Sequence, residues 1–195
     1  MFHRCMGVLA ALLVAANGLA LAAVEKVSVR VDGLACPFCA YNIEKRVRKL
    51  DGLDRSTRIE TIVAKGMVHF RWKASRPFDP MLVRKAIHEA GFTARTMELT
   101  ASGTVQIPKG TAQAALLRLV DEGAQQAILL RPADGADYRK AWDGLKAQAQ
   151  ATSDGGAAQR IRVEGQVQVG KKGERDAPWS LILHRWTRLS SGPSR

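Results

Sequence analysis

Two cysteines stand three positions apart in the segment Gly33-Leu34-Ala35-Cys36-Pro37-Phe38-Cys39. Thiols at this spacing can converge on one soft metal ion, or they can close into a short disulfide with redox activity. The remaining cysteine, Cys5, lies near the start of the chain. The function of the protein therefore depends first on which of these two uses the pair serves.

The pattern of apolar residues places this two-thiol loop between a strand and a helix. Residues 26–31 alternate apolar and polar side chains, which predicts a half-buried strand that Asp32-Gly33 ends. From Cys39 onward apolar residues recur at helical spacing, and Asp51-Gly52 ends the helix. Because the start of a helix stabilises negative charge, we expect Cys39 to be favoured as a thiolate.

The segment after this helix predicts a hairpin, a second helix and a final strand. Residues 58–64 and 67–72 flank the turn Lys65-Gly66. Alternation places the side chains of Val68, Phe70 and Trp72 in the core. It places those of Met67, His69 and Arg71 outside. Asp79-Pro80 predicts a helix start, Gly91 its end, and residues 93–99 a strand. The order predicts a split βαβ sandwich with both helices on one face of the sheet.

The pattern changes after Leu99 and predicts a small barrel. Residues 100–110 contain Gly103, Pro108 and Gly110, with a short extended piece at 104–107. Residues 114–120 and 126–131 flank a hairpin turn, although Leu116-Leu117 also permits a helix. Residues 137–151 are helical in pattern, and residues 161–169 and 179–189 are strands. Three strands, a helix and two strands suggest a five-stranded barrel of OB type.

Residues 26–99 resemble the heavy-metal-associated domain of copper chaperones, metal-transporting ATPases and periplasmic mercury scavengers. The family carries Gly-Met-x-Cys-x-x-Cys between its first strand and first helix, and an aromatic residue before its last strand, matched by Gly91-Phe92. Leu34 departs from the usual Met, which packs under the loop, so leucine should fill the same volume. The resemblance implies an α+β, ferredoxin-like βαββαβ domain with Cys36 and Cys39 as metal ligands. The family of the barrel is unclear.

The ligand set points to a particular class of ion. Two thiolates alone give a near-linear or trigonal site, which suits Cu(I) or Hg(II). Zinc is less favoured because it requires four ligands, and no further ligands are evident nearby. His69 and His88 are expected at the surface, as is Met67, while Met97 is a strand residue near the end of the sheet.

Thiol redox chemistry is the alternative to metal binding. The tetrapeptide Cys36-Pro37-Phe38-Cys39 is of the kind found in glutaredoxin-like enzymes. Those folds also need a proline that faces the dithiol from a later strand, and Pro108 is the one candidate. The hairpin directly after the first helix favours the ferredoxin-like order instead.

The N-terminal segment predicts export. Arg4 precedes an apolar run, and Ala20-Leu21-Ala22 offers a cleavage site for a signal peptide of residues 1–22. The alternative is an uncleaved membrane anchor, since the apolar run is near the lower length for spanning. The predicted domains are residues 23–99 (metal-binding) and 100–189 (barrel), with a disordered tail at 190–195. The net charge of +12 is spread along the chain without an aromatic platform, so we read it as a solvated surface rather than a nucleic-acid interface.

These observations predict an exported, non-enzymatic carrier or scavenger of one soft metal ion. The partner is expected to be a metal-transporting membrane protein or another metal-binding domain, with no nucleic acid and no stable membrane insertion after signal cleavage. Cys36 is expected to be the first contact during ligand exchange and Cys39 to hold the ion. The alternative is a periplasmic thiol-disulfide oxidoreductase that uses the same dithiol.

Overall fold

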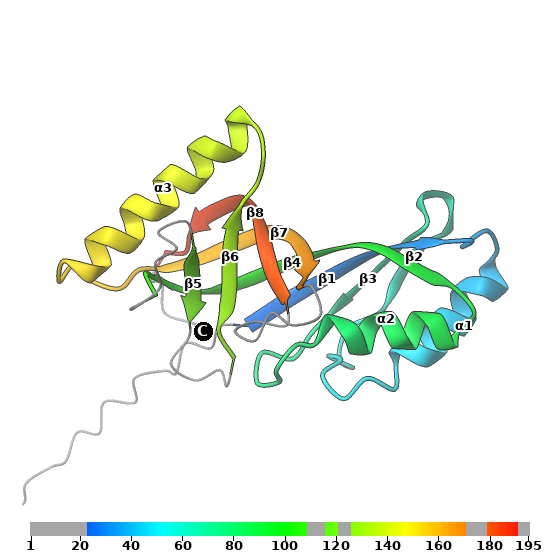
Figure 1. The fold of residues 1–195 in the computed structure, drawn as a ribbon. Helices are drawn as coiled ribbons and strands as arrows, with labels where there is room; N and C mark the ends of the chain where they lie inside the picture. Colours follow the sequence, from blue (N-terminus) through cyan, green and yellow to red (C-terminus); the bar gives the residue numbers. More distant parts are fainter. Residues whose placement is uncertain (1–22, 109–115, 121–125, 171–178, 191–195) are drawn as a thin grey trace, which may run out of the picture.

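The first half of the chain forms a four-stranded antiparallel sheet with two helices. The computed structural model describes residues 23–108, 116–120, 126–170 and 179–190 (Figure 1). The sheet order is β2-β3-β1-β4, and the elements follow in the predicted sequence: β1 (Ala23–Asp32), α1 (Pro37–Val47), β2 (Glu60–Ile62), a 3₁₀ turn η1 (Val63–Lys65), β3 (Met67–Arg71), α2 (Pro80–Glu89) and β4 (Thr93–Gln106). The predicted signal peptide lies outside the described residues.

Alternation along the strands explains why the helices cover one face only. Val27, Val29 and Val31 of β1 are buried, whereas Lys26 just before them and Arg30 between two of them are exposed. On β3, Val68 and Phe70 are buried, and Trp72 directly after the strand is also buried, as predicted. The apolar faces of α1 and α2 pack on this side of the sheet, and the opposite face stays open.

The second half forms a closed barrel of five strands. The new elements are β5 (Leu117–Val120), β6 (Ile128–Pro132), α3 (Ala136–Ser153), β7 (Arg160–Val169) and β8 (Trp179–Arg188). The ring runs β4-β5-β6-β8-β7 and returns to β4, with the β6–β8 pair parallel and the others antiparallel. The helical alternative at Leu116-Leu117 is wrong because residues 117–120 pair with both β4 and β6. The predicted turn at 121–123 lies outside the described residues.

Strand β4 differs from its prediction because it does not stop at Leu99. The whole strand is 14 residues long, from Thr93 to Gln106. Its central part pairs with β1 on one side and β7 on the other. Gly103, which suggests a turn in the sequence, instead pairs with Ile161 inside the ladder. Glycine is tolerated within a strand where a sheet bends. Figure 1 shows β4 running from the sheet beside α1 and α2 into the barrel. The two halves therefore share one strand.

The two halves also share one hydrophobic core. The buried apolar residues form one cluster that extends from α1 and α2 into the barrel interior. At the junction, the ring of Phe78 packs edge-on against Trp72 at 5.1 Å and Trp179 at 5.7 Å between centroids. The side-chain amide of Gln126 accepts from the Phe78 N–H at 2.6 Å and donates to its carbonyl at 2.8 Å. An ion pair between Arg162 and Glu25 crosses the same junction.

The start of α2 offers a direct test of a predicted helix cap. Asp79 has extended backbone angles, and its carboxylate accepts from the N–H of Met81 at 2.8 Å, with Pro80 at the first helical position. We expect Asp79→Ala to lower the free energy of unfolding by about 0.5–2 kcal/mol, because one N–H at the helix start loses its acceptor. Urea denaturation measures this loss. Asp79→Ser, which can still cap, should lose clearly less; equal losses would contradict the role.

Candidate metal centre

The two-thiol loop turns sharply at Gly33 and rests on buried side chains. Gly33 has φ of +78°, a conformation that favours glycine, and a side chain there would lie 3.7 Å from the ring of Phe92. Leu34 is buried beneath the loop, where the sequence placed it. The aromatic residue that precedes the last strand thus lies against the start of the loop and fixes its path.

Cys36 caps α1, which corrects the prediction that the helix begins at Cys39. Cys36 has an extended backbone, the helix starts at Pro37, and the Cys36 sulfur accepts from the N–H of Cys39 at 3.1 Å. Proline at the first helical position explains the shift, since its fixed φ starts the helix and the residue before it becomes the cap. The backbone N–H at the helix start therefore stabilises negative charge on Cys36 rather than on Cys39.

The structure brings the two predicted site residues together. Cys36 and Cys39 are joined in a disulfide, and their Cα atoms lie 5.1 Å apart. Both side chains are half-buried, and Cys39 packs against the edge of the core. The pair is thus in its oxidised form, in which neither sulfur has a thiolate to offer a metal ion. The disulfide must gain two electrons before the two sulfurs can bind a metal ion.

The exposed side chains that follow the thiols at the start of α1 are aromatic. Phe38 and Tyr41 are 71% and 60% exposed and stack on one another at 6.5 Å between ring centroids. The first turn of α1 carries no acidic residue, and Lys45 and Arg46 lie in its last turn. Phe38 is therefore an exposed ring beside the dithiol, on the surface that an approaching molecule meets.

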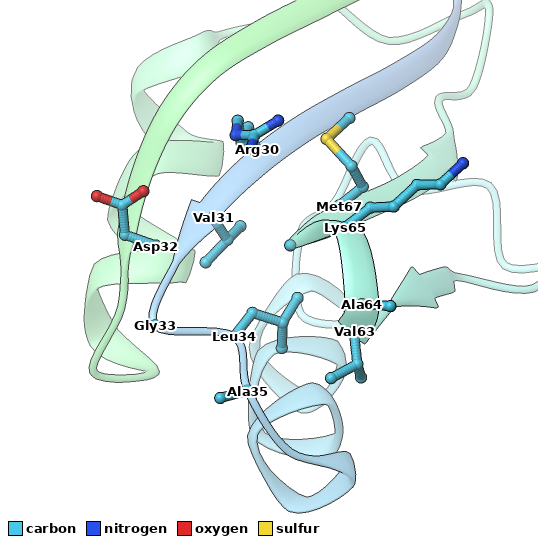
Figure 2. A pocket seen from close by; sticks show the side chains of 11 residues that line it. Arg30, Val31, Asp32, Gly33, Leu34, Ala35, Val63, Ala64, Lys65 and Met67 are labelled. Atoms are coloured by element: carbon cyan, nitrogen blue, oxygen red, sulfur yellow. The ribbon is translucent and has the colours of Figure 1, made fainter.

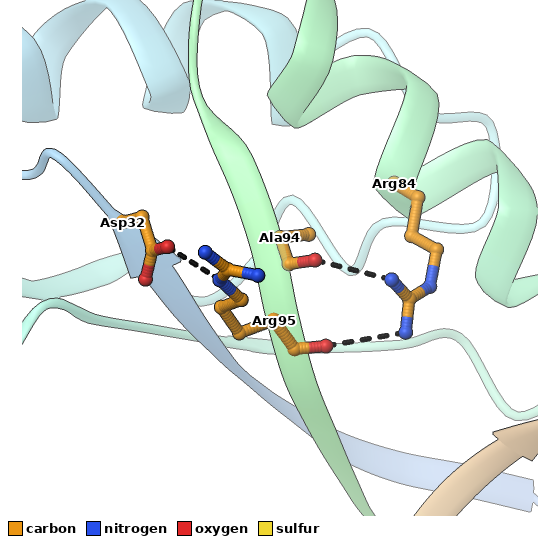
Figure 3. Close-up of polar contacts among 4 residues, drawn as sticks. All are labelled: Asp32, Arg84, Ala94 and Arg95. Carbon is orange, nitrogen blue, oxygen red and sulfur yellow. Dashed lines mark hydrogen bonds and ion pairs between the residues drawn. The ribbon is translucent and has the colours of Figure 1, made fainter.

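A set of polar contacts holds the two strands that flank the loop. Arg95 at the start of β4 forms an ion pair with Asp32 at the end of β1 (Figure 3). Arg84 of α2 donates from Nη1 to the Ala94 carbonyl at 3.1 Å and from Nη2 to the Arg95 carbonyl at 3.2 Å. These contacts join β1, β4 and α2 immediately before the loop. They could not be predicted from the sequence, since the pairing of Asp32 with Arg95 depends on strand register.

The other candidate ligands do not converge on the thiols. Met97 is fully buried in β4, His88 is exposed on α2, and Met67 is half-buried on β3. His69 lies on the face of the sheet opposite the helices and its Nδ1 is 2.8 Å from the Ser28 hydroxyl. Within the described part of the chain, no three His, Cys, Asp or Glu side chains are grouped so that they could hold a metal ion.

His69 gives the fold a pH dependence. Burial, together with the positive charge of Lys26, holds the pKa of His69 below its usual value of 6.5, against the opposing effect of Glu60. As the pH falls below about 6.5 the unfolded chain gains this proton before the folded chain does, so the stabilisation is present above that pH and is lost as the pH falls toward and through the lowered pKa of the folded state.

The measurement is the melting temperature between pH 7.5 and pH 5. We expect His69→Gln, which can keep the contact with Ser28, to flatten the decline toward acid. An unchanged slope in this variant would show that His69 is not the group responsible.

The barrel adds no further cluster of reactive side chains in the described residues. Trp142 and Trp179 are buried, and Trp186 is half-buried with its indole N–H donating to the Ala141 carbonyl at 2.8 Å. His184 packs against the ring of Tyr138 at 5.1 Å between centroids. None of the helices in the described ranges is long and apolar enough to cross a membrane.

The redox candidate Pro108 lies far from the thiols. Thr93, the first residue of β4, pairs with Asp32 beside the loop, and β4 then runs to Gln106 in the barrel. At about 3.3 Å per residue this path is roughly 40 Å long, and Pro108 comes after its end. A proline in that position does not face the dithiol.

Comparisons with known proteins give partial matches to small metal-binding domains. No family model and no curated protein matches the chain. The N-terminal domain of PacS from Synechocystis PCC6803 is 21% identical over 36% of this chain and 94% of that one, with a TM-score of 0.30. The CopZ metallochaperone is 20% identical over 36% of this chain and 100% of that one, with a TM-score of 0.33. The N-terminal domain of ZntA in the apo-form is 24% identical over 37% and 90%, with a TM-score of 0.32.

Proposed function

We propose that this protein is a non-enzymatic carrier or scavenger of one soft metal ion, Cu(I) or Hg(II), held by Cys36 and Cys39. The observation that carries the proposal is the convergence of the two sulfurs at the start of α1. Once reduced, the pair offers two thiolates from a short, fixed segment. Soft ions that accept few ligands fit this donor set, whereas zinc is less favoured.

The proposed transfer proceeds by ligand exchange. An incoming thiolate of the partner attacks the bound ion and gives a three-coordinate intermediate, after which one of the two cysteines leaves. Cys36, at the end of the loop, is the ligand that exchanges first. Cys39 lies within the helix and against the core, so it retains the ion longer. The ion is therefore never free in water.

The fold classification of the two halves of the chain is part of the same proposal. We assign residues 23–99 to a ferredoxin-like unit because two helices cover one face of an antiparallel β2-β3-β1-β4 sheet. Residues 100–189 fit an OB-like barrel, since three strands precede its helix, two follow it, and the third and fifth strands pair in parallel.

Export and the partner are also part of the proposal. Residues 1–22 would direct the chain to the periplasm, and the partner would be a metal-transporting membrane protein or another metal-binding domain. The exposed rings of Phe38 and Tyr41 beside the thiols, with Lys45 on the same helix, suit a partner that presents apolar and acidic side chains.

The test is native mass spectrometry of the reduced full chain with Cu(I) and, separately, with Hg(II). We expect one ion per chain in each case, because one pair of thiolates forms one site. The variant Cys36→Ser/Cys39→Ser should show no adduct under the same conditions. An adduct that survives this double substitution would place the metal elsewhere and overturn the proposal.

The closed disulfide supports a second candidate function, a thiol-disulfide oxidoreductase. The same dithiol would exchange electrons with a substrate protein, and its first cysteine caps a helix, as reactive thiols commonly do. The position of Pro108 argues against this candidate. Two measurements distinguish the candidate functions: the reduction potential of the Cys36–Cys39 pair and the reductase activity on a protein disulfide. The oxidoreductase requires that activity and a potential suited to exchange with its substrate.

A further inference from the structure

An open pocket lies directly beside the two-thiol loop. Its volume is about 630 Å³, and it is lined by the end of β1 and the loop residues 33–35 together with the turn formed by residues 63–67 (Figure 2). The Val31 N–H donates to the Gly66 carbonyl at 2.8 Å, so the end of β1 and the turn are joined along one side of the pocket. The apolar side chains of the lining are Val31 and Leu34, which are almost fully buried, and Val63, which is half-buried. Ala35, which also lines the pocket, is the residue before Cys36 in the chain. Cys36 and Cys39 themselves are not among the lining residues, so a bound molecule would have to extend past Ala35 to reach the disulfide.

The charges around the pocket are unbalanced. Arg30 and Lys65 line it from two separate segments, both are exposed, and neither forms an ion pair within the described ranges. Asp32, the acidic residue of the lining, is already paired with Arg95 outside the pocket. In the view of Figure 2, Arg30 and Lys65 lie on the side away from Ala35. A ligand with carboxylates at one end and another reactive group at the other matches this arrangement.

We propose that this pocket binds a low-molecular-weight thiol that carries carboxylates, and that the bound thiol reduces the Cys36–Cys39 disulfide. The carboxylates contact Arg30 and Lys65, and the sulfur lies toward Cys36. A pocket of this volume can hold a molecule the size of a short peptide of a few residues. The inference rests on the proposed function in one respect, that the pair must be reduced before it can hold a metal ion.

The reaction balances with two molecules of the small thiol. The thiolate of the first attacks the Cys36 sulfur, the Cys36–Cys39 bond breaks, and Cys39 leaves as a thiolate. The second thiolate then attacks the sulfur of the first in the mixed disulfide, and Cys36 leaves as a thiolate. The two small thiols become one disulfide and supply two electrons, and their two protons pass to the leaving thiolates or to water. The protein is left with the free dithiol.

The experiment follows reduction of the oxidised full chain by glutathione, a thiol with two carboxylates, and by 2-mercaptoethanol, which has none. Alkylation of free thiols at timed intervals gives the rate, expressed per concentration of thiolate. The test variant is Arg30→Gln/Lys65→Gln. The matched control is Arg139→Gln/Lys140→Gln, which removes the same charge from α3, remote from the loop.

We expect the test variant to react with glutathione about five- to tenfold more slowly than the unchanged protein, as two surface ion pairs of ordinary strength would give. Its rate with 2-mercaptoethanol should be unchanged, and the control variant should match the unchanged protein with both thiols. S-methylglutathione, which cannot react, should slow the glutathione reaction competitively. Equal slowing in both variants, or no inhibition by S-methylglutathione, would overturn the proposal.

This outcome is separable from that of the metal-binding test. The reduction assay contains no metal, whereas metal binding is measured on protein reduced with a phosphine, which needs no pocket. A chain that binds no metal can therefore still show selective reduction by glutathione. A chain without that selectivity can equally still bind its ion.

Discussion

If the proposed Cu(I) site is correct, we expect replacing either Cys36 or Cys39 alone with serine to lower the affinity for Cu(I) by more than about 100-fold, which exceeds the range seen when only an outer-shell partner is lost. A near-linear site needs both sulfurs, and a hydroxyl is a hard ligand that Cu(I) accepts poorly. Competition of the reduced protein against a chromophoric Cu(I) chelator measures this loss.

The matched control for this prediction is Leu34→Met, which introduces the residue that heavy-metal-associated domains usually have at this position of the loop. Leu34 is buried beneath the loop and a methionine fills a similar volume, so the affinity should stay within a few-fold of the original. The melting temperatures of all variants must be compared at the same redox state. If either single serine variant retained the full affinity, the two-thiolate site would be refuted.

Removing the ring of Phe78 lowers the free energy of unfolding by about 3–5 kcal/mol, the usual cost of emptying a buried aromatic site. The ring is 1% exposed and contacts Trp72 of the first half and Trp179 of the barrel, so Phe78→Ala leaves a cavity at the junction. Urea unfolding followed by tryptophan fluorescence and by far-ultraviolet circular dichroism measures the loss. Because one core serves both halves, we expect the two signals to coincide in the unchanged protein.

Two further variants show which part of the junction matters. Phe78→Leu keeps most of the apolar volume and should cost less than Phe78→Ala. Gln126→Ala removes the amide that pairs with both backbone groups of Phe78 and should cost about 1–3 kcal/mol, because those groups lose their partner. Separate transitions for the two halves of the unchanged protein would contradict the shared core.

Much of the first half could be predicted because its determinants are local. The alternation in β1 and β3 assigns the buried face, and Asp79-Pro80 marks the start of α2 where the structure has it. The same rule applies to Cys36-Pro37: proline at the first helical position makes the preceding residue the cap. Applied consistently, it would have identified Cys36 as the cap from the sequence.

The features that could not be predicted are non-local. Glycine is common in turns, which is why Gly103 suggests one. The strand nevertheless continues, because both β1 and β7 supply backbone partners to the same segment. Phe78 fits a local contact with its own helix, and nothing in its neighbourhood indicates Trp179, about a hundred positions later. The pocket beside the loop likewise exists because the turn after β2 lies across from Ala35.

The doubly paired middle of β4 determines where this chain can be divided. Leu99 pairs with Val27 on one side and with Gly165 on the other, so a cut after it takes the β7 partners from Glu98 and Leu99 and removes residues 100–102, which pair with the start of β1. A fragment of residues 23–99 would present unpaired backbone at the end of β4 and the start of β1, and such edges recruit strands from other molecules. Self-association of that fragment would then reflect an exposed edge rather than bridging by metal.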